Sequence, residues 1–473
     1  MFSKYVHTIK TQSGKSLYNA LTTKLFILSE TQFREIKNDK PLQSIFNSQQ
    51  CALLSQKGFL RGDNEADLTE IVKFNRQEKP DLFALYLILT EECNMNCLYC
   101  SQSSFRTRKI FPAMSLDTIE HSLSKFYNSR TDRKRVVVLY GGEPTVNKSG
   151  VIHAINCIRN VQGDDNCEIV IFTNGFNVDS ELIDFFAAQG VSVIISLDGN
   201  KATHDKFRLC GNQGTFEKVN DTINQFKEKK ISFGISATIA AHNVDRLDDL
   251  VNYFCDNYNP FSIGFNPLHY PPPNRKSISV DYDTMADKMI AAYDTAAQRG
   301  VYIEQIMRRV RPFVLAQPRL KDCPSCGGMI RVLPDGSFGP CGHFMEEKKE
   351  MEKNQQSFSE SQLLSKWNTR LIFTMNQCSN CRALALCGGG CPYNSYKNNG
   401  DIFSANDKRS CIQADKFLQW MVDKIVKRFG NNEFHEVTAE EKLTVLGNIN
   451  LDKYIPLGEY SQYGEFKLEP RLK

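Results

Sequence analysis

The stretch LYLILTEECNMNCLYC, residues 85–100, decides both the fold and the chemistry expected of this chain. Its first six residues are an apolar run of strand length, and such a run is typical of a parallel strand buried on both faces. Three cysteines follow in a C-x3-C-x2-C pattern: Cys93, Cys97 and Cys100. Because the reactive groups of parallel α/β sheets collect at the carboxyl ends of the strands, this pattern predicts a thiolate site at such an end.

Five further strand-like runs follow this stretch, and amphipathic segments of helix length separate them. The runs are VVVLYG (136–141), EIVIFTNG (168–175), SVIISLDG (192–199), SFGISATI (232–239) and FSIGFN (261–266). Strands that alternate with helices predict βα units and a parallel sheet. Six units are too few for a closed eight-stranded barrel, so we expect an α/β fold with an open, partial (βα)6 TIM-like barrel over residues 83–303.

Three further parts flank the predicted barrel. Residues 1–82 combine a strand-like KSLYNALTTKLFIL (15–28) with helical segments at 31–36 and 42–58, which predicts a small α+β domain. Residues 304–420 are expected to hold a bridging helix and a cysteine-rich domain. A C-terminal helix and a polar tail are expected over residues 421–473, and the prolines at 271–273 are expected to interrupt the barrel pattern.

Composition excludes several classes of protein. The 473 residues contain 58 Lys and Arg against 54 Asp and Glu, a net charge of +4 that is too small to indicate a nucleic-acid partner. No apolar run approaches the ~18 residues of a membrane span, and the start MFSKYVHTIK is too charged for a signal peptide, so we expect a cytoplasmic protein with no membrane partner. A cytosolic chain with 16 cysteines is expected to use them for metal or redox chemistry. Outside the dense cysteine segments, Cys157, Cys167 and Cys255 are expected to be small buried hydrophobic residues.

Three closely spaced thiolates can hold one face of an iron–sulfur cluster, and three ligands for four irons leave one iron open. A catalytic zinc site is the alternative, because zinc also binds thiolates and keeps an open position. The cysteine pattern, with Tyr99 before the third cysteine, resembles the radical S-adenosylmethionine superfamily. Gly141-Gly142-Glu143-Pro144, after the second strand, is similar to the motif with which that family holds the amino group of S-adenosylmethionine.

The resemblance continues at the ends of the third and fourth strands. SLDGNKATHDKFR, residues 196–208, is similar to the form found in peptide- and protein-modifying members. The resemblance implies these further contacts to S-adenosylmethionine: Asn174, Ser196, Asp198 and Arg208. Simpler explanations also exist, because a Gly-Gly pair is often only a tight turn, and Ser196 or Asp198 can cap the next helix.

Eight more cysteines lie in the C-terminal third of the chain: Cys323, Cys326, Cys341, Cys378, Cys381, Cys387, Cys391 and Cys411. Their spacing resembles the SPASM extension of radical S-adenosylmethionine enzymes, with Cys323 as an eighth ligand. The resemblance implies two auxiliary [4Fe-4S] clusters, one on Cys323, Cys326, Cys341 and Cys391 and the other on Cys378, Cys381, Cys387 and Cys411. A pair of zinc ribbons is the alternative, and without Cys323 as a ligand the first cluster would have an open iron.

The resemblance implies an enzyme that reductively cleaves S-adenosylmethionine to a 5′-deoxyadenosyl radical and modifies a ribosomally synthesised precursor peptide by a thioether or carbon–carbon cross-link. It also implies an electron donor such as flavodoxin or ferredoxin, and an N-terminal winged-helix-like domain that docks a leader peptide by strand addition. No residue is assigned as a catalytic base. A sulfatase-activating enzyme is the first alternative, although that branch has an Asp after the cysteine corresponding to Cys341, where this chain has Gly342. A non-catalytic iron–sulfur electron-transfer protein and a zinc-dependent binding module are the others.

Overall fold

The computed structural model describes residues 1–60, 80–100, 112–129, 131, 133–161, 167–268, 277–353 and 357–447. Its central element is a nine-stranded sheet in the order β12-β11-β10-β7-β6-β5-β4-β13-β14. The six predicted strands are confirmed and lie parallel in chain order: β4 (Ala84–Thr90), β5 (Arg135–Gly141), β6 (Cys167–Thr173), β7 (Ser192–Ser196), β10 (Phe233–Ile239) and β11 (Ser262–Pro267). The α/β partial barrel expected from the sequence is therefore present.

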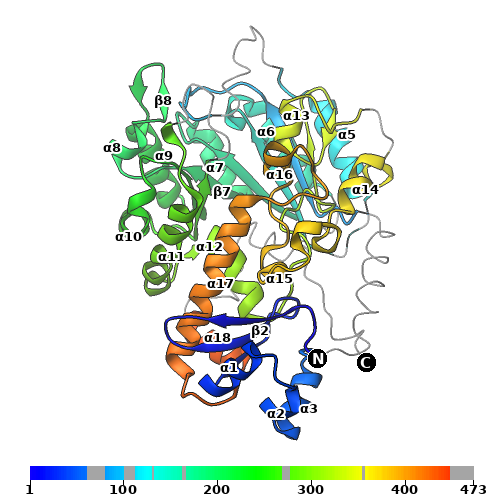
Figure 1. Cartoon of the computed structure of the whole chain (residues 1–473). Coiled ribbons are helices and arrows are strands. Elements are labelled where there is room, and N and C mark those ends of the chain that lie inside the picture. The colour runs from blue at the N-terminus through cyan, green and yellow to red at the C-terminus, as the bar shows by residue number, and fades with distance from the viewer. Residues whose placement is uncertain are drawn as a thin grey trace.

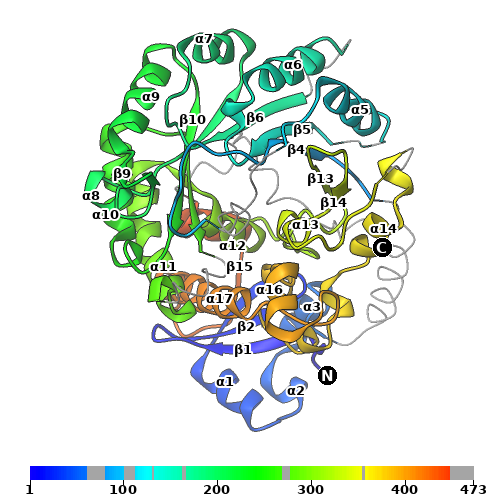
Figure 2. The same cartoon turned by 90° about the horizontal axis from the view of Figure 1, so that it is seen from above.

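Helices cover the outside of this sheet (Figure 2). The covering helices are α5 (Leu116–Tyr127), α6 (Lys148–Arg159), α7 (Ser180–Gln189), α9 (Phe216–Glu228), α10 (Leu247–Asn257) and α11 (Tyr282–Arg299). Successive strand side chains point to opposite faces, so each strand contributes to two cores. On β4, Leu85, Leu87 and Leu89 pack in the core shared with the helices, whereas Ala84 and Tyr86 belong to a separate core on the inner face.

The short helix α8 (Lys201–His204) and a separate hairpin of β8 (Leu209–Cys210) and β9 (Gln213–Gly214) follow β7 along the chain. The two edges of the large sheet are completed by later parts of the chain. At one edge, β12 (Tyr302–Ile303) extends the sheet beside β11. At the other edge, β13 (Met329–Val332) pairs in parallel with β4, and β14 (Phe338–Gly339) pairs with β13. The sequence analysis did not predict β13, which brings the cysteine-rich segment beside β4, the strand that directly precedes the first three cysteines.

The N-terminal part forms a four-stranded antiparallel sheet in the order β1-β2-β3-β15. Its strands are β1 (Val6–Lys10), β2 (Lys15–Asn19), β3 (Leu25–Leu28) and β15 (His435–Val437). The stretch at 15–28, which was expected to be one strand, forms the two antiparallel strands β2 and β3. The helices of this part are α1 (Glu30–Lys37), α2 (Leu42–Ile45) and α3 (Ser48–Gln56). α2 and α3 divide the single helical segment expected at 42–58, because Asn47 caps α3 by accepting a hydrogen bond from the Gln50 N–H. The long C-terminal helix α17 (Lys408–Phe429) runs from the cysteine-rich part to this sheet, where α18 (Ala439–Leu446) also lies (Figure 1).

Between β12 and α17 the chain forms short helices joined by loops. The α-helices are α12 (Glu304–Val314), α13 (Gly342–Glu346), α14 (Gln362–Asn368), α15 (Leu384–Cys387) and α16 (Pro392–Asn399). None of the helices in the described residues is long and apolar enough to cross a membrane. The proline run at 271–273 and the expected tail beyond residue 447 lie outside the described residues.

Candidate active site

The first three cysteines lie in the loop that directly follows β4, which we call the cysteine loop (residues 91–100). All three cysteines are partly buried, and two backbone hydrogen bonds tie the loop to the segment after β7: the Asn96 N–H donates to the Leu209 carbonyl over 2.7 Å, and the Leu98 N–H donates to Phe207 over 2.8 Å. Burial raises the pKa of the Cys97 thiol to about 12, and the nearby thiols of Cys100 and Cys93 add to this effect while Arg208 opposes it. A metal centre converts such thiols to thiolates by displacing their protons, so the loop fits a cationic cluster bound by three cysteines.

The two glycines after β5 are required by their packing against the cysteine loop. A Cβ atom on Gly141 would lie 2.3 Å from the carbonyl oxygen of Thr90, and one on Gly142 would lie 2.2 Å from the carbonyl oxygen of Glu92. The Gly142 N–H donates to Thr90 over 2.9 Å, and the Glu143 N–H donates to Glu92 over 2.7 Å. The Gly-Gly pair therefore lets the motif after β5 approach the cysteine loop backbone to backbone.

Glu143 is buried and its carboxylate is held by hydrogen bonds from three residues. Oε1 accepts from the Thr145 hydroxyl over 2.7 Å and from the Thr173 hydroxyl over 2.8 Å, and Oε2 accepts from the Asn174 N–H over 2.6 Å. Burial raises the pKa of Glu143, and these hydrogen bonds oppose the rise. Since each carboxylate oxygen can accept two hydrogen bonds, Oε2 keeps capacity for one more donor, such as an ammonium group. Pro144 is buried at the start of the short 3₁₀ helix η2 (Pro144–Val146) and fixes the exit of this motif.

Asn174 connects the cysteine loop to the motif after β5. Its side-chain Nδ2 donates to Asn94 Oδ1 over 2.8 Å and to Cys93 Sγ over 3.6 Å, and its backbone N–H is the donor to Glu143 described above. Its Oδ1 accepts from the Phe176 N–H over 2.8 Å. The Asn174 side chain is thus engaged with protein groups and with the thiol of Cys93.

Asp198 and Arg208 pair with each other beneath the cysteine loop. The fully buried Asp198 carboxylate lies 3.1 Å from Arg208 Nε and accepts from the Tyr99 hydroxyl over 2.6 Å and from the Thr238 N–H over 3.0 Å. Burial acts to raise the pKa of Asp198, but the Arg208 guanidinium holds it below its usual value. The pair therefore positions Tyr99, and with it the cysteine loop. Ser196, another of the predicted contacts, is half-buried at the end of β7.

His242 follows β10 and was not singled out by the sequence analysis. Both of its ring nitrogens are buried and have no hydrogen-bond partner among the described residues. The ring lies 4.4 Å from the ring of Phe207, whose carbonyl holds the cysteine loop at Leu98. Burial lowers the pKa of His242, so at neutral pH the imidazole offers one donor and one acceptor at this end of the barrel. Its place just beyond a strand end was the only available sequence signal.

The eight later cysteines gather in two groups of four. Burial raises the pKa of Cys341 to about 12 and raises that of Cys391 further, and in both cases the nearby thiol of Cys323 contributes. Cys323 likewise adds to the raised pKa of Cys326. We call the group Cys323, Cys326, Cys341 and Cys391 the Cys323 set.

The remaining four thiols, Cys378, Cys381, Cys387 and Cys411, influence one another in the same way, and we call them the Cys378 set. Burial raises the pKa of Cys411 to about 12, with contributions from Cys378 and Cys381. The two sets are the same groups that the SPASM resemblance implies as ligand sets.

Buried arginines lie beside both sets. Asp322 Oδ1 lies 2.9 Å from Arg309 Nη1 and 3.3 Å from Arg319 Nη2, and Arg309 Nη1 also donates to the Cys387 carbonyl over 3.2 Å. Arg308 and Arg311 are neighbours of this group, so among the described residues four guanidinium groups face three nearby carboxylates, Asp322, Glu304 and Asp407. An excess of buried positive charge is costly unless an anion balances it. The thiol sets therefore fit anionic metal–thiolate centres.

Comparisons with known proteins identify a family and several relatives to which this chain is similar. Residues 87–254, from β4 to α10, match the Radical SAM superfamily. A cysteine-type anaerobic sulfatase-maturating enzyme of Clostridium novyi is 25% identical over 363 residues, which cover 71% of this chain and 94% of the relative. The radical SAM cyclopropyl synthase TigE of Paramaledivibacter caminithermalis is 22% identical over 474 residues, covering 90% of this chain and 96% of the relative.

A solved structure shares the fold. Native anSMEcpe with bound AdoMet and the Kp18Cys peptide superposes with a TM-score of 0.62 at 19% identity, covering 74% of this chain and 99% of that chain. The segment that matches the family, residues 87–254, holds the cysteine loop, the motif with Glu143 and the Asp198–Arg208 pair. This chain is therefore similar to the Radical SAM superfamily over residues 87–254, the part that carries the cysteine loop and the motif after β5.

Proposed function

We propose that this enzyme reductively cleaves S-adenosylmethionine and uses the product radical to install a thioether or carbon–carbon cross-link in a ribosomally synthesised precursor peptide. Enzymes of the superfamily use a [4Fe-4S] cluster and S-adenosylmethionine. One observation carries the proposal: hydrogen bonds from Asn174 join Cys93 of the cysteine loop to Glu143 of the motif after β5. Similarity to relatives named as a sulfatase-maturating enzyme and a cyclopropyl synthase supports a maturation reaction.

Cys93, Cys97 and Cys100 are the proposed ligands of the catalytic cluster, and the Cys323 and Cys378 sets are the proposed ligands of two auxiliary [4Fe-4S] clusters. When bound, the catalytic cluster and S-adenosylmethionine supply a 5′-deoxyadenosyl radical that abstracts hydrogen from a substrate C–H bond, and the auxiliary clusters supply sites for electron acceptance. The arginines around Asp322 balance the negative charge of the auxiliary centres. We expect the electron donor to be a flavodoxin or ferredoxin.

Residues of this chain bind and orient S-adenosylmethionine. Glu143 offers Oε2 to the ammonium group, and its orientation is fixed by Thr145, Thr173 and Asn174. Gly141, Gly142 and Pro144 keep Glu143 close to the cysteine loop. Ser196 adds a hydroxyl at the end of β7, and the Asp198–Arg208 pair lines the site while it holds Tyr99 in place.

The inner face of the barrel provides the surroundings for the reacting part of the peptide. Three aromatic rings line it, with centroids 6.0 Å apart for Tyr86 and Tyr140 and 5.5 Å apart for Tyr140 and Phe172. The Arg331 guanidinium of β13 lies 4.3 Å from the centre of the Tyr86 ring. Such a surface excludes water and suits an apolar or aromatic peptide side chain.

Gly342 argues against sulfatase-type chemistry in this enzyme. A Cβ on Gly342 would lie 3.1 Å from Arg331 Nη1, so the position after Cys341 adjoins a cation. The carboxylate expected there in a sulfatase-activating enzyme is absent from this chain. We therefore propose that the substrate is a precursor peptide in which the enzyme forms a cross-link. The sulfatase-type reaction is the alternative to be tested.

The N-terminal sheet is the proposed docking site for a leader peptide. β1 is at one end of this sheet and pairs only with β2 among the described residues. An edge strand presents unpaired N–H and C=O groups, which an extended peptide can meet by strand addition. α18 and α12 connect this sheet to the barrel, since Lys442 Nζ donates to the Thr23 carbonyl over 2.8 Å and to the Phe313 carbonyl over 2.9 Å.

The first test is the formation of 5′-deoxyadenosine by anaerobically reconstituted enzyme with dithionite and S-adenosylmethionine. We expect product from the wild type and none from Cys97→Ala. Iron content and colour distinguish the iron–sulfur proposal from the zinc alternatives, because iron–sulfur clusters contain iron and give a brown protein, whereas zinc thiolates are colourless. Loaded clusters without 5′-deoxyadenosine would favour the electron-transfer alternative.

The second test offers the enzyme two kinds of peptide. Precursor peptides encoded beside the gene are expected to lose two mass units per cross-link, and a sulfatase-derived Cys peptide is expected to remain unchanged. Conversion of the sulfatase peptide to formylglycine would instead support the alternative reaction.

A further inference from the structure

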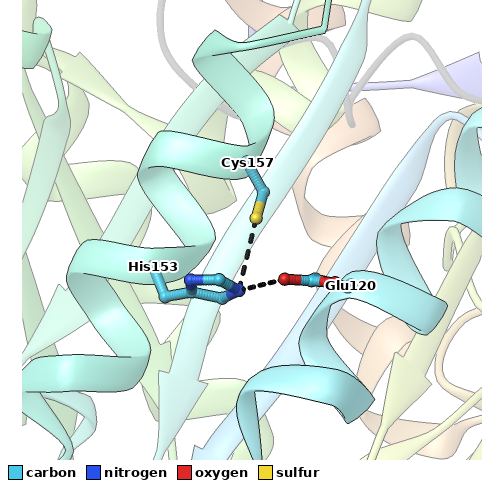
Figure 3. Close-up of side chains that lie close together, drawn as sticks. All are labelled: Glu120, His153 and Cys157. Carbon is cyan, nitrogen blue, oxygen red and sulfur yellow. Dashed lines mark hydrogen bonds and ion pairs between the residues drawn. The ribbon is translucent and has the colours of Figure 1, made fainter.

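A group of three side chains on the outer helices of the barrel stands apart from all the sites described above. Glu120 of α5 and His153 and Cys157 of α6 point toward one another (Figure 3). Glu120 Oε1 lies 2.8 Å from His153 Nε2, and Cys157 Sγ lies 3.5 Å from the same nitrogen. The expectation that Cys157 is a small buried hydrophobic residue is met only in part, because the residue packs against the core but its thiol is half-buried and faces a histidine.

We propose that Glu120, His153 and Cys157 bind one Zn²⁺ ion, with water at the fourth position. The three donor atoms lie within 4.8 Å of one another. A thiolate, an imidazole and a carboxylate are the ligand types that zinc takes in proteins. Bond lengths of about 2.3 Å to sulfur and about 2.0 Å to nitrogen in a tetrahedral site place these two atoms roughly 3.5 Å apart, the separation observed between Cys157 and His153.

Convergence on a single nitrogen distinguishes this group from a catalytic triad. In a Cys-His-carboxylate triad the thiol and the carboxylate contact different ring nitrogens, so that one nitrogen accepts a proton while the other is held by the acid. Here both groups face Nε2 of His153. In either neutral tautomer this nitrogen satisfies only one neighbour, because it donates to Glu120 or accepts from Cys157. A cation at their meeting point satisfies all three lone pairs.

The arrangement of the two helices suits chelation. His153 and Cys157 are four residues apart on α6 and therefore lie on one face of the helix, the spacing by which two side chains of one helix bind one metal. Glu120 reaches the same point from α5, so a bound ion links two neighbouring helices. The side chains of Glu120 and His153 are 57% and 26% exposed, which leaves a path for the ion and for water. Binding balances as Zn²⁺ entering and the thiol proton of Cys157 leaving to solvent.

Zinc binding by the full-length, cluster-loaded protein under anaerobic conditions tests this proposal. Equilibrium dialysis against Zn²⁺ with a weak competing chelator gives the affinity, and zinc K-edge absorption identifies the ligands without interference from iron. We expect one zinc per chain with one sulfur at about 2.3 Å and nitrogen or oxygen at about 2.0 Å. Cys157→Ser and His153→Asn are expected to weaken binding at least about tenfold.

Matched variants keep the test selective. Cys255→Ser changes another half-buried helix cysteine, and His121→Asn changes an exposed histidine next to Glu120, so both are expected to bind zinc like the wild type. Cys157→His is expected to restore binding with no sulfur in the zinc spectrum. Equal binding by the wild type and Cys157→Ser, absence of binding in the wild type, or a zinc spectrum with several sulfurs would overturn the proposal.

Discussion

The side-chain amide of Asn174 donates a hydrogen bond to Sγ of Cys93 over 3.6 Å. The same residue donates its backbone N–H to Glu143, so one residue at the end of β6 serves both the cysteine loop and the motif after β5. A hydrogen bond to a thiolate favours the charged form and therefore supports ligation by Cys93. The relationship predicts that Asn174 matters for cluster retention even though it is not a ligand.

Asn174→Asp tests this role, because it replaces the donor beside Cys93 with a carboxylate that repels a thiolate. We expect the retained catalytic-cluster iron, or the rate of 5′-deoxyadenosine formation, to fall at least about tenfold. Iron analysis and product quantification under anaerobic conditions are the measurements. Asn224→Asp changes an exposed residue of α9 and is expected to behave like the wild type. Equal loss in both variants would show that added charge, and not the contact with Cys93, causes the effect.

Gly142→Ala is expected to prevent the close approach of the motif after β5 to the cysteine loop. The new Cβ would lie 2.2 Å from the Glu92 carbonyl oxygen, a backbone atom that cannot move without the loop. We expect loss of most catalytic-cluster iron while the auxiliary centres remain, as measured by iron content and electron paramagnetic resonance of the reduced protein.

Gly190→Ala is the matched control for Gly142→Ala. Gly190 ends α7 in a left-handed conformation with open space around its Cα, so the substitution adds backbone strain of about 1 kcal/mol without a clash. Its iron content is expected to equal that of the wild type. Normal cluster content in Gly142→Ala would contradict the packing argument.

Asp198→Asn is expected to destabilise the protein far more than Tyr99→Phe. Removing the carboxylate charge leaves the buried Arg208 guanidinium without its counter-ion, a change that costs about 3–5 kcal/mol in comparable buried pairs. Tyr99→Phe removes a single 2.6 Å hydrogen bond and leaves Arg208 and the Thr238 N–H on Asp198, so about 1 kcal/mol is expected. Thermal unfolding under anaerobic conditions ranks the two variants.

The double variant Asp198→Asn with Arg208→Met provides the internal control for this pair. It removes both charges, so its unfolding temperature is expected to exceed that of Asp198→Asn alone. A double variant as unstable as the sum of the two single variants would show that the two residues do not interact.

Local sequence pattern was sufficient for the barrel, because each of its six strands is a long apolar run with its own helix. The pattern also identified the thiols that the structure groups into two sets. It missed β13 and β15, since strands of three or four residues carry little periodicity and pair with strands far away along the chain. The arginines around Asp322 and the histidine at 242 were missed for a related reason: their role depends on burial, which periodicity does not reveal for a charged or polar side chain.

Lys442 predicts a pH dependence of stability at the junction of the N-terminal sheet and the barrel. Burial lowers the pKa of this lysine to about 7. Its unfolded pKa is about 10.4, so between pH 7 and pH 10 the unfolded chain binds the proton that the folded chain lacks, and stability rises with pH by about 1.4 kcal/mol per unit from this group. Below pH 7 both states are protonated and the contribution is constant.

Lys442→Met isolates this contribution, because it removes the titrating group while it keeps most of the buried volume. The unfolding temperature of the wild type, measured from pH 7 to pH 9, is expected to rise relative to that of Lys442→Met. Lys366→Met, at a residue with an exposed side chain on α14, is the control and should follow the wild type across this range. Parallel pH profiles for the wild type and Lys442→Met would mean that Lys442 stays charged in the folded protein, held by the carbonyls of Thr23 and Phe313.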